Sequence, residues 1–386
     1  MKYLSCLNKT MVSTSFIPFN KPYINSKALE YLTEAISSGE LQGDGSFTKK
    51  CEIEINKISG TNNSLLTPSC TDAIEMAYML IGISPGDEVI MPSFNFTSAA
   101  IAAVKLGATP VFVDVDLETL NISQKEVLNS VSKKTKAICF LNYAGYGVDL
   151  DLIKSNISSQ DIYLIEDNAH GFGGKYMKSN LGNLGDISVQ SFHSTKNIQC
   201  GEGGSINFKH ETFLSRSQVL RQKGTNRYDF SKGLVSKYTW VDQGSSFLAS
   251  ELQAAVLYSQ LQEYNQIQTS RENIWKRYFL GINSKYIQLP LASENFEHTS
   301  HIFYLRLPSH KIREEFISYM LKNEVQVTSH YETLHNSIAG KKHGKFFGSL
   351  SNSIKISETI VRLPIWIGLT ETLQNQIIEL VNNFEA

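Results

Sequence analysis

Short apolar segments alternate with helix-like segments over the first two thirds of this chain. Parallel strands need long crossover connections, most often helices, so this alternation predicts a mostly parallel sheet covered by helices on both faces. The expected strands are residues 88–91, 109–115, 136–141, 162–165, 187–192 and 204–208. The expected helices between the early strands are residues 71–82 and 98–106. The fold class is therefore α/β.

The pattern changes near residue 250. The sequence predicts one long helix over 251–279, a strand over 301–307, a helix over 311–324 and a terminal helix over 370–384. With 386 residues, the chain exceeds the usual span of one compact core. We therefore predict a flexible N-terminal tail (1–16), a large domain (17–269) and a smaller C-terminal α+β domain (270–386).

Composition excludes several classes of partner. The chain has 36 Lys and Arg against 37 Asp and Glu, which gives no electrostatic case for binding nucleic acid or an anionic membrane. No apolar run is long enough to span a bilayer, and the start of the chain lacks the pattern of a signal peptide. The five cysteines are scattered and odd in number, which disfavours a disulfide framework or a zinc site and fits the cytoplasm.

The polar residues that follow the apolar strands are the candidate site, because ligands of open α/β sheets bind at the carboxyl ends of the strands. Lys196 lies in SFHSTKN, after a predicted strand and before the glycine cluster 201–204. A lysine desolvated there has a lowered pKa and can form an imine with an aldehyde cofactor. The alternative is an ordinary lysine of a surface loop.

Three other residues complete a pattern with Lys196. Asp167 follows the strand 162–165 and can pair with a cationic ring nitrogen, or simply cap a helix. Thr71 opens a helix whose free amides suit a phosphate, or is only part of a cap. Phe96 can stack on a planar ring, or pack in the core. Together, the phosphate site, the aromatic residue, the carboxylate and the lysine are the groups that pyridoxal 5′-phosphate (PLP) requires.

Longer stretches resemble a known family. IEDNAHG (165–171), SFHSTKN (191–197) and GEGG (201–204) resemble the DegT/StrS sugar aminotransferases, which have PLP fold type I (aspartate aminotransferase-like). GELQGDGSFTKKCE (39–52) and KYTWVDQGSSFLASELQAA (237–255) are similar to the dTDP-4-amino-4,6-dideoxyhexose transaminases of that family. The resemblance extends from about Ile17 to the C-terminus.

The resemblance implies a role for each candidate residue. Lys196 would hold the cofactor through an imine and shuttle the reacting proton. Asp167 would contact the pyridine nitrogen, and Phe96 would cover one face of the ring. His170 would lie near the ring hydroxyl, with a core histidine as the alternative. The groups expected to hold the phosphate are the side chain of Thr71, the amide of Asp72 and the hydroxyl of Ser191.

The chain departs from many members of the family at two places. Many members have Tyr-Asn-Tyr-Arg in place of residues 245–248, and their Asn reaches the phosphate of the neighbouring subunit. Ser246 is therefore expected to make this contact, in weaker form or through water, across the interface of a homodimer. Thr333 stands where HYETLH-like motifs (330–335) often have proline. The side chains of Lys223 and Arg227 are candidates for the substrate diphosphate, with solvent-exposed loop charges as the alternative.

The resulting functional prediction is a PLP-dependent transfer of an amino group from L-glutamate to dTDP-4-keto-6-deoxy-D-glucose. The product would be dTDP-Fuc4N or dTDP-Qui4N, for a bacterial surface polysaccharide (O-antigen or common antigen). The stereochemistry at C4 stays open. The alternatives are a 3-keto sugar nucleotide aminotransferase and a non-enzymatic PLP-binding regulator. A dehydratase is disfavoured because Lys196 is retained.

Two further motifs are interpreted as structural. Asp114 and Asp116 form D-x-D without a third metal ligand, so we expect no metal there. His193, three residues before Lys196, is expected to have a structural role.

Overall fold

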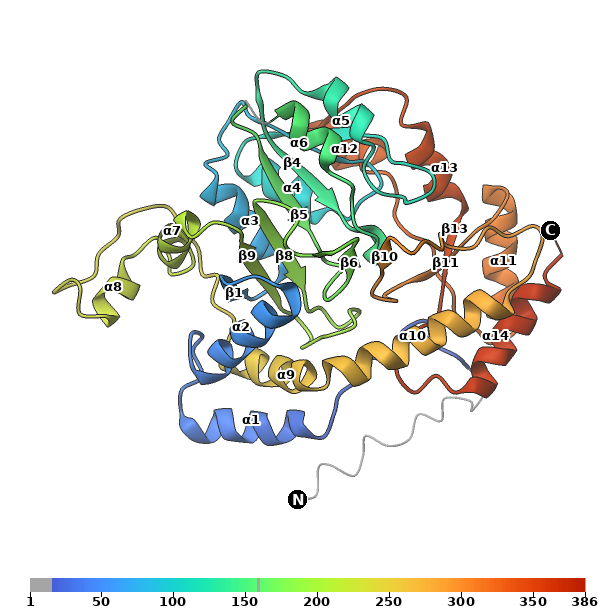
Figure 1. The fold of residues 1–386 in the computed structure, drawn as a ribbon, viewed down its shortest axis with the longest axis horizontal. Coiled ribbons are helices and arrows are strands. Elements are labelled where there is room, and N and C mark those ends of the chain that lie inside the picture. The colour runs from blue at the N-terminus through green and yellow to red at the C-terminus, as the bar shows by residue number, and fades with distance from the viewer. Residues whose placement is uncertain (1–15, 158–159, 386) are drawn as a thin grey trace.

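The structure is a computed structural model that describes residues 16–157 and 160–385 (Figure 1). The predicted tail, residues 1–16, lies outside the described residues except for its last position. Within the described ranges, no helix is both long and apolar enough to cross a lipid bilayer.

An eight-stranded sheet forms the centre of the molecule, in the order β1-β9-β8-β5-β4-β2-β3-β12. The strands from β8 to β12 in this order pair in parallel, whereas β9 is antiparallel to both of its neighbours. The prediction of a mostly parallel sheet is confirmed; β1 and β12 are strands that the pattern did not indicate. Their bounds are β1 (Ser64–Thr67), β2 (Glu88–Pro92), β3 (Thr109–Val113), β4 (Thr135–Leu141), β5 (Tyr163–Asp167), β8 (Ile187–Ser191), β9 (Gly204–Phe208) and β12 (Lys345–Phe346).

Alternate side chains of a strand point to opposite faces of the sheet, and helices cover both faces, so both sets of side chains are buried. Val89 and Met91 of β2 pack into a core with α3 and α4, while Ile90 between them packs into a second core with α5 and α6. A third core joins α1, α2 and α9 (Glu251–Gln262) to the loop that carries Lys196. The helices concerned are α1 (Lys27–Ser38), α2 (Ser46–Ser59), α3 (Cys70–Leu80), α4 (Ser98–Lys105), α5 (Gln124–Ser130) and α6 (Asp151–Ile157).

The strand predicted over 109–115 ends at Val113, and the side chain of Asp114 after it bonds outside the sheet. Its carboxylate accepts the backbone N–H groups of Asn352 (3.0 Å) and Ser353 (2.7 Å) at the start of α13 (Ser351–Thr359). Asp116 accepts the N–H groups of the turn that follows it. Both carboxylates of the D-x-D motif thus accept hydrogen bonds from backbone amides.

The single long helix predicted over 251–279 is wrong. Two helices, α9 (Glu251–Gln262) and α10 (Tyr264–Gly281), are joined at Glu263, whose φ of −105° and ψ of 14° are not helical. The Glu263 carboxylate accepts a hydrogen bond from the hydroxyl of Tyr23 (2.9 Å). Figure 1 shows the two helices running in sequence beneath the sheet toward the C-terminal helices. A tertiary contact at the joint is not visible in a periodic pattern.

The C-terminal residues form a further core with α10 and with Ile17, which bridges to Val325. The predicted boundary at 269/270 falls inside α10, so the division into two domains stays a proposal.

The remaining elements are α11 (His310–Lys322), α12 (Ile338–His343), α13 (Ser351–Thr359), α14 (Glu371–Asn383), the pair β11 (Phe303–Arg306) and β13 (Ile360–Leu363), the small sheet of β6 (Lys175–Tyr176), β7 (Ser179–Asn180) and β10 (Phe296–Glu297), and two 3-10 turns at Tyr143–Gly145 and Leu334–Asn336.

Residues 222–246 form an arm that follows α7 (Thr212–Leu220), contains α8 (Arg227–Ser231) and is closed at its base by a bridge between Gln222 and Ser246. Figure 1 shows α8 projecting from the left edge of the molecule, away from the sheet. Several large apolar side chains of the arm face solvent.

Candidate active site

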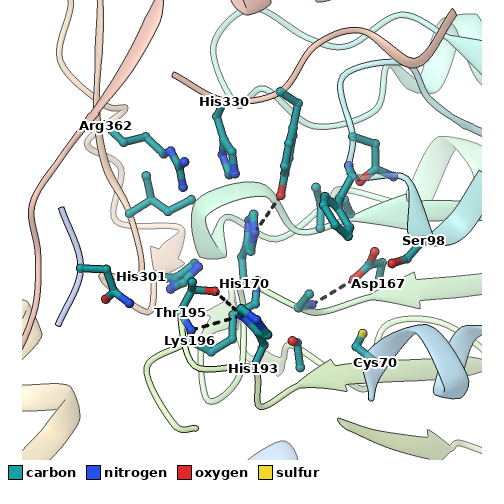
Figure 2. Close-up of a pocket in the computed structure, with 18 of the residues that line it drawn as sticks. Cys70, Ser98, Asp167, His170, His193, Thr195, Lys196, His301, His330 and Arg362 are labelled. Atoms are coloured by element: carbon teal, nitrogen blue, oxygen red, sulfur yellow. Dashed lines mark hydrogen bonds between the residues drawn. The ribbon is translucent and has the colours of Figure 1, made fainter. Parts of the chain in front are cut away.

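A cavity of about 620 Å³ opens at the carboxyl ends of the central strands. Figure 2 shows Cys70, Ser98 and Asp167 on one side of it and His301 and Arg362 on the other. Of the predicted site residues, the structure brings six to its wall: Thr71, Phe96, Asp167, His170, Ser191 and Lys196. These residues are far apart in the sequence and meet because each follows a strand or opens a helix at the same edge.

Strand register accounts for the position of the helix start in this cavity. Gly204 of β9 lies opposite Thr67 at the end of β1 and opposite Ser191 at the end of β8. The start of α3 and Ser191 are therefore neighbours. A Cβ on residue 204 would lie 2.4 Å from the backbone N of Cys70, so only glycine permits this approach.

The first turn of α3 offers backbone N–H groups and hydroxyls to the cavity. Ser69 caps the helix, and its side chain accepts the N–H of Asp72 (3.1 Å). The hydroxyls of Thr71 and Ser98 lie 2.7 Å apart. A helix N-terminus carries a partial positive charge, so this corner of the cavity suits an anion.

Lys196 is enclosed by the cavity wall, and this burial lowers the pKa of its ammonium group to about 8. The positive charge of Arg362 acts in the same direction, while Cys70 and Asp167 act in the opposite one. With a pKa near 8, about a tenth of the amine is neutral at pH 7 and available as a nucleophile. Lys196 thus lines the cavity, which disfavours the alternative of an ordinary surface lysine, and its role in holding a cofactor stays a prediction.

Asp167 is the last residue of β5 and is 5% exposed. Burial raises its pKa, which the N–H of Ala169 (3.1 Å) and the charge of Lys196 partly oppose. No helix follows Asp167 before residue 212 in the described part of the chain, so the alternative of a helix cap is wrong. A buried carboxylate of this kind is stabilised when a cation binds next to it.

The neighbouring carboxylate, Glu166, fixes the end of β5. It is fully buried and accepts the N–H groups of Gly182 (2.7 Å) and Leu184 (2.7 Å), as well as an amide hydrogen of Asn142 (2.7 Å). Since β5 side chains alternate, Glu166 points away from the cavity and Asp167 into it.

His170 is neutral in this site. Its Nδ1 accepts the N–H of Ala144 (3.3 Å), so Nε2 carries the proton and donates to the hydroxyl oxygen of Tyr331 (3.2 Å; Figure 2). Burial lowers the pKa of His170 well below its usual value, and the charges of Lys196 and Arg362 act in the same direction. His170 therefore bonds to the backbone, as the alternative of a core histidine predicts, and it also lines the cavity. Its place near a ring hydroxyl stays a prediction.

Four predicted residues lie elsewhere. Asp72 does not line the cavity, and its amide already donates to Ser69. Lys223 and Arg227 are exposed on the arm, as is Ser246, whose backbone bridges to Gln222. Within one copy of the chain, the arm residues contribute nothing to the cavity.

The cavity also contains residues to which the sequence analysis gave no part in the site. His193, for which it predicted a structural role, lines the cavity and bonds through Nδ1 to the Thr195 hydroxyl (2.9 Å). Side chains from the C-terminal part complete the wall: His301, His330, Tyr331 and Arg362, with Arg271 of α10. HYETLH was a usable signal for His330 and Tyr331, whereas the segment around Arg362 carries no pattern that indicates a site.

Comparison with known proteins decides the family. A model of the DegT/DnrJ/EryC1/StrS aminotransferase family matches residues 22–382. The chain belongs to this family.

Individual relatives match nearly the whole chain. This chain is 29% identical over 379 residues to the spore coat polysaccharide biosynthesis protein SpsC of Bacillus subtilis, and the match covers 95% of this chain and 97% of SpsC. Its structure is similar to that of the aminotransferase TlmJ from Streptoalloteichus hindustanus, with a TM-score of 0.86, 26% identity and coverage of 95% and 97%. The PLP-form of Spr1654 from Streptococcus pneumoniae has the same fold, with a TM-score of 0.88, 24% identity and coverage of 95% and 98%.

PLP is the cofactor of this aminotransferase family, and the cavity has the groups that it needs. The start of α3 suits the phosphate, the carboxylate of Asp167 suits a protonated ring nitrogen, and the amine of Lys196 suits the aldehyde. The Lys196 amine has no carboxylate within 4.0 Å among residues 16–157 and 160–385. When bound, PLP supplies the aldehyde that captures an amino group and the ring that accepts electrons.

Proposed function

We propose that this aminotransferase is a cytoplasmic enzyme that transfers an amino group from L-glutamate to the ketone of dTDP-4-keto-6-deoxy-D-glucose, for the biosynthesis of a bacterial surface polysaccharide. The observation that carries the transamination is a lysine with a lowered pKa in one cavity with a buried carboxylate and a helix N-terminus. The sugar is supported by the resemblance of residues 39–52 and 237–255 to the 4-aminotransferases. The polysaccharide is supported by the name of SpsC.

In this proposal, the residues of the chain have distinct roles. Lys196 holds the cofactor at rest and then, as a free amine, moves a proton from the reacting substrate carbon. Asp167 keeps the ring nitrogen protonated. Phe96 covers the ring, and neutral His170 lies at its edge. The phosphate is held by Thr71 and Ser191, with Asp72 contributing if its amide turns away from Ser69.

The proposed product defines the first prediction. With L-glutamate as donor, the enzyme is expected to aminate dTDP-4-keto-6-deoxy-D-glucose at C4, and NMR of the product identifies dTDP-Fuc4N or dTDP-Qui4N. The 3-keto isomer is the matched control substrate. Amination of the 3-keto isomer alone would contradict the 4-keto proposal, and no turnover with either sugar would favour a PLP-binding regulator.

A homodimer is the second part of the proposal, and the arm supports it. Its side chains Phe230, Leu234, Tyr238, Trp240 and Val241 are each more than 40% exposed, with Trp240 at 78%. Large apolar groups gathered on one exposed segment are typical of an interface. The arm also carries Ser246, Lys223 and Arg227, which the proposal assigns to the cofactor phosphate and the substrate diphosphate of the partner's site.

The dimer proposal gives the second prediction. The double variant Leu234→Asp/Trp240→Asp is expected to be monomeric in light scattering and to lose most of its activity, because the partner's Ser246 no longer reaches the site. Leu280→Asp is the matched control, since Leu280 is at least as exposed (83%) but lies on α10. A wild type that is monomeric, or a double variant that stays dimeric, would contradict the proposal.

A further inference from the structure

A buried arginine holds the α1–α2 loop (residues 39–45), which connects these two helices. The side chain of Arg221 is 2% exposed and donates through Nη2 to the carboxylate of Asp44 (2.8 Å) in this loop. Through Nη1 it donates to the carboxylate of Glu52 in α2 (3.4 Å). Glu52 in turn accepts the N–H of Leu66 in β1 (3.1 Å). Arg221 therefore joins the loop to α2 and, through Glu52, to the central sheet.

A second buried charge holds the end of the same loop. The carboxylate of Glu251, at the start of α9, accepts the N–H groups of Gly45 (3.1 Å), Phe47 (2.7 Å) and Thr48 (3.0 Å). These amides belong to the first turn of α2, where a negative charge is favoured by the helix dipole. The N–H of Glu251 also donates to the carbonyl of Leu41 (3.1 Å). The loop is thus attached to the main body by an arginine and a glutamate.

These two residues flank the arm in the sequence. Arg221 directly precedes the arm, and Glu251 follows shortly after its last residue. The bridge between Gln222 and Ser246 closes the base of the arm, and the N–H of Phe247 donates to the carbonyl of Arg221 (3.1 Å). Figure 1 shows the turn from α1 to α2 on the left side of the molecule, the side from which the arm projects. The loop and the arm are therefore connected at one place.

Stability alone does not account for the contact between Arg221 and Asp44. Asp44 has a φ of 73°, a left-handed conformation that glycine adopts at lower cost, although glycines occupy both neighbouring positions. A buried guanidinium with carboxylates also loses hydration that the attraction between the charges only partly offsets. Burial raises the pKa of Glu52 to about 7 in spite of the nearby charge of Arg221. What the contact does provide is a fixed position for the loop.

We propose that Arg221 is a positioning residue for the sugar nucleotide, which holds the α1–α2 loop and the arm in one arrangement. The inference rests on the proposed function, which assigns Lys223 and Arg227 of the arm to the substrate diphosphate in the partner's site. Residues 39–45, all of them described, do not line the cavity of their own copy. Leu41 is instead exposed (41%), as are the apolar side chains of the arm. The loop therefore faces the partner's site together with the arm.

This arrangement serves the sugar half of the reaction. The keto sugar carries a diphosphate and a nucleoside, which extend well beyond the reacting carbon, whereas L-glutamate is small and has no diphosphate. A displaced loop and arm base would therefore weaken the binding of the sugar nucleotide and leave the reaction with the amino acid almost unchanged.

The test measures the two half-reactions separately through the absorption change of the cofactor. Asp44→Gly removes the contact with Arg221 and relieves the left-handed backbone, so the variant should fold and remain dimeric in light scattering. The concentration of dTDP-4-keto-6-deoxy-D-glucose at half-maximal rate is expected to rise at least tenfold, while the reaction with L-glutamate stays within twofold of wild type. Met177→Gly is the matched control, since Met177 is exposed and left-handed (φ 53°) in the turn between β6 and β7.

Paired variants show whether Arg221 acts through the loop. Arg221→Met should raise the half-maximal sugar concentration as Asp44→Gly does, with Arg221→Lys between it and wild type. The double variant Arg221→Met/Asp44→Gly should show no further loss, because both changes remove the same contact. Should Arg221→Met fail to fold, Asp44→Gly decides the matter by itself.

Three results would overturn the inference alone. They are an unchanged sugar half-reaction in Asp44→Gly, an equal loss of both half-reactions in this variant, and effects that multiply in the double variant. A wild type that reacts with L-glutamate but with no keto sugar nucleotide would instead overturn the proposed function, and this inference with it.

Discussion

Replacing Lys196 with alanine is expected to abolish turnover, with single-turnover conversion reduced by at least about a thousandfold. Under the proposed function, the variant would lose two groups at once: the amine that attaches the cofactor and the base that moves the substrate proton. The lowered pKa of this amine, about 8, is what suits it to both. Rapid-quench measurement of one turnover, on protein reconstituted with PLP, reports the loss without the complication of product release.

The control for this prediction is Lys209→Ala, which removes an exposed lysine just after β9 and should leave activity unchanged. A chemical measurement on the wild type is independent of mutagenesis. The purified protein should be yellow, and borohydride should fix the cofactor covalently to Lys196, as located by mass spectrometry. An adduct on another lysine, or normal single-turnover rates in Lys196→Ala, would contradict the assignment.

The sequence predicted the sheet and one side of the cavity well, for a physical reason. Strands buried on both faces are nearly uniformly apolar, so β2, β4 and β5 were visible as runs, and the polar residue after each run had to lie at the same edge. Asp167 and Lys196 were found in this way. Strand β12 has two residues and is held at the edge by β3, so its own sequence carries almost no signal.

The other side of the cavity could not be predicted in the same way. His301 and Arg362 come from the C-terminal part, and they face Lys196 only because that part packs against the end of the sheet. The break at Glu263 likewise depends on contacts from distant residues, including Tyr23. A local sequence pattern does not predict such tertiary contacts. The family resemblance indicated the HYETLH segment, but it assigned no roles to His330 and Tyr331.

Asp167→Asn separates the electronic role of this residue from its structural one. Asparagine keeps an oxygen that accepts the N–H of Ala169, and no helix in the described ranges begins at Asp167. Folding and cofactor content should therefore remain close to wild type. What asparagine lacks is the negative charge that would keep a pyridine nitrogen protonated in this buried site. Without that proton, the ring accepts electrons poorly.

The expected result is full cofactor occupancy with activity reduced at least about a hundredfold, which corresponds to about 2.7 kcal/mol of barrier. The loss should appear in the step in which the substrate carbon gives up its proton, so a deuterium at that carbon should slow the variant more than the wild type. Asp116→Asn, which changes an exposed carboxylate in a turn, is the matched control. A near wild-type single-turnover rate in Asp167→Asn at full occupancy would mean that Asp167 is not the partner of the ring nitrogen. In that case, the raised pKa of Asp167 would reflect burial alone, and the electron-accepting ring would need another source of its proton.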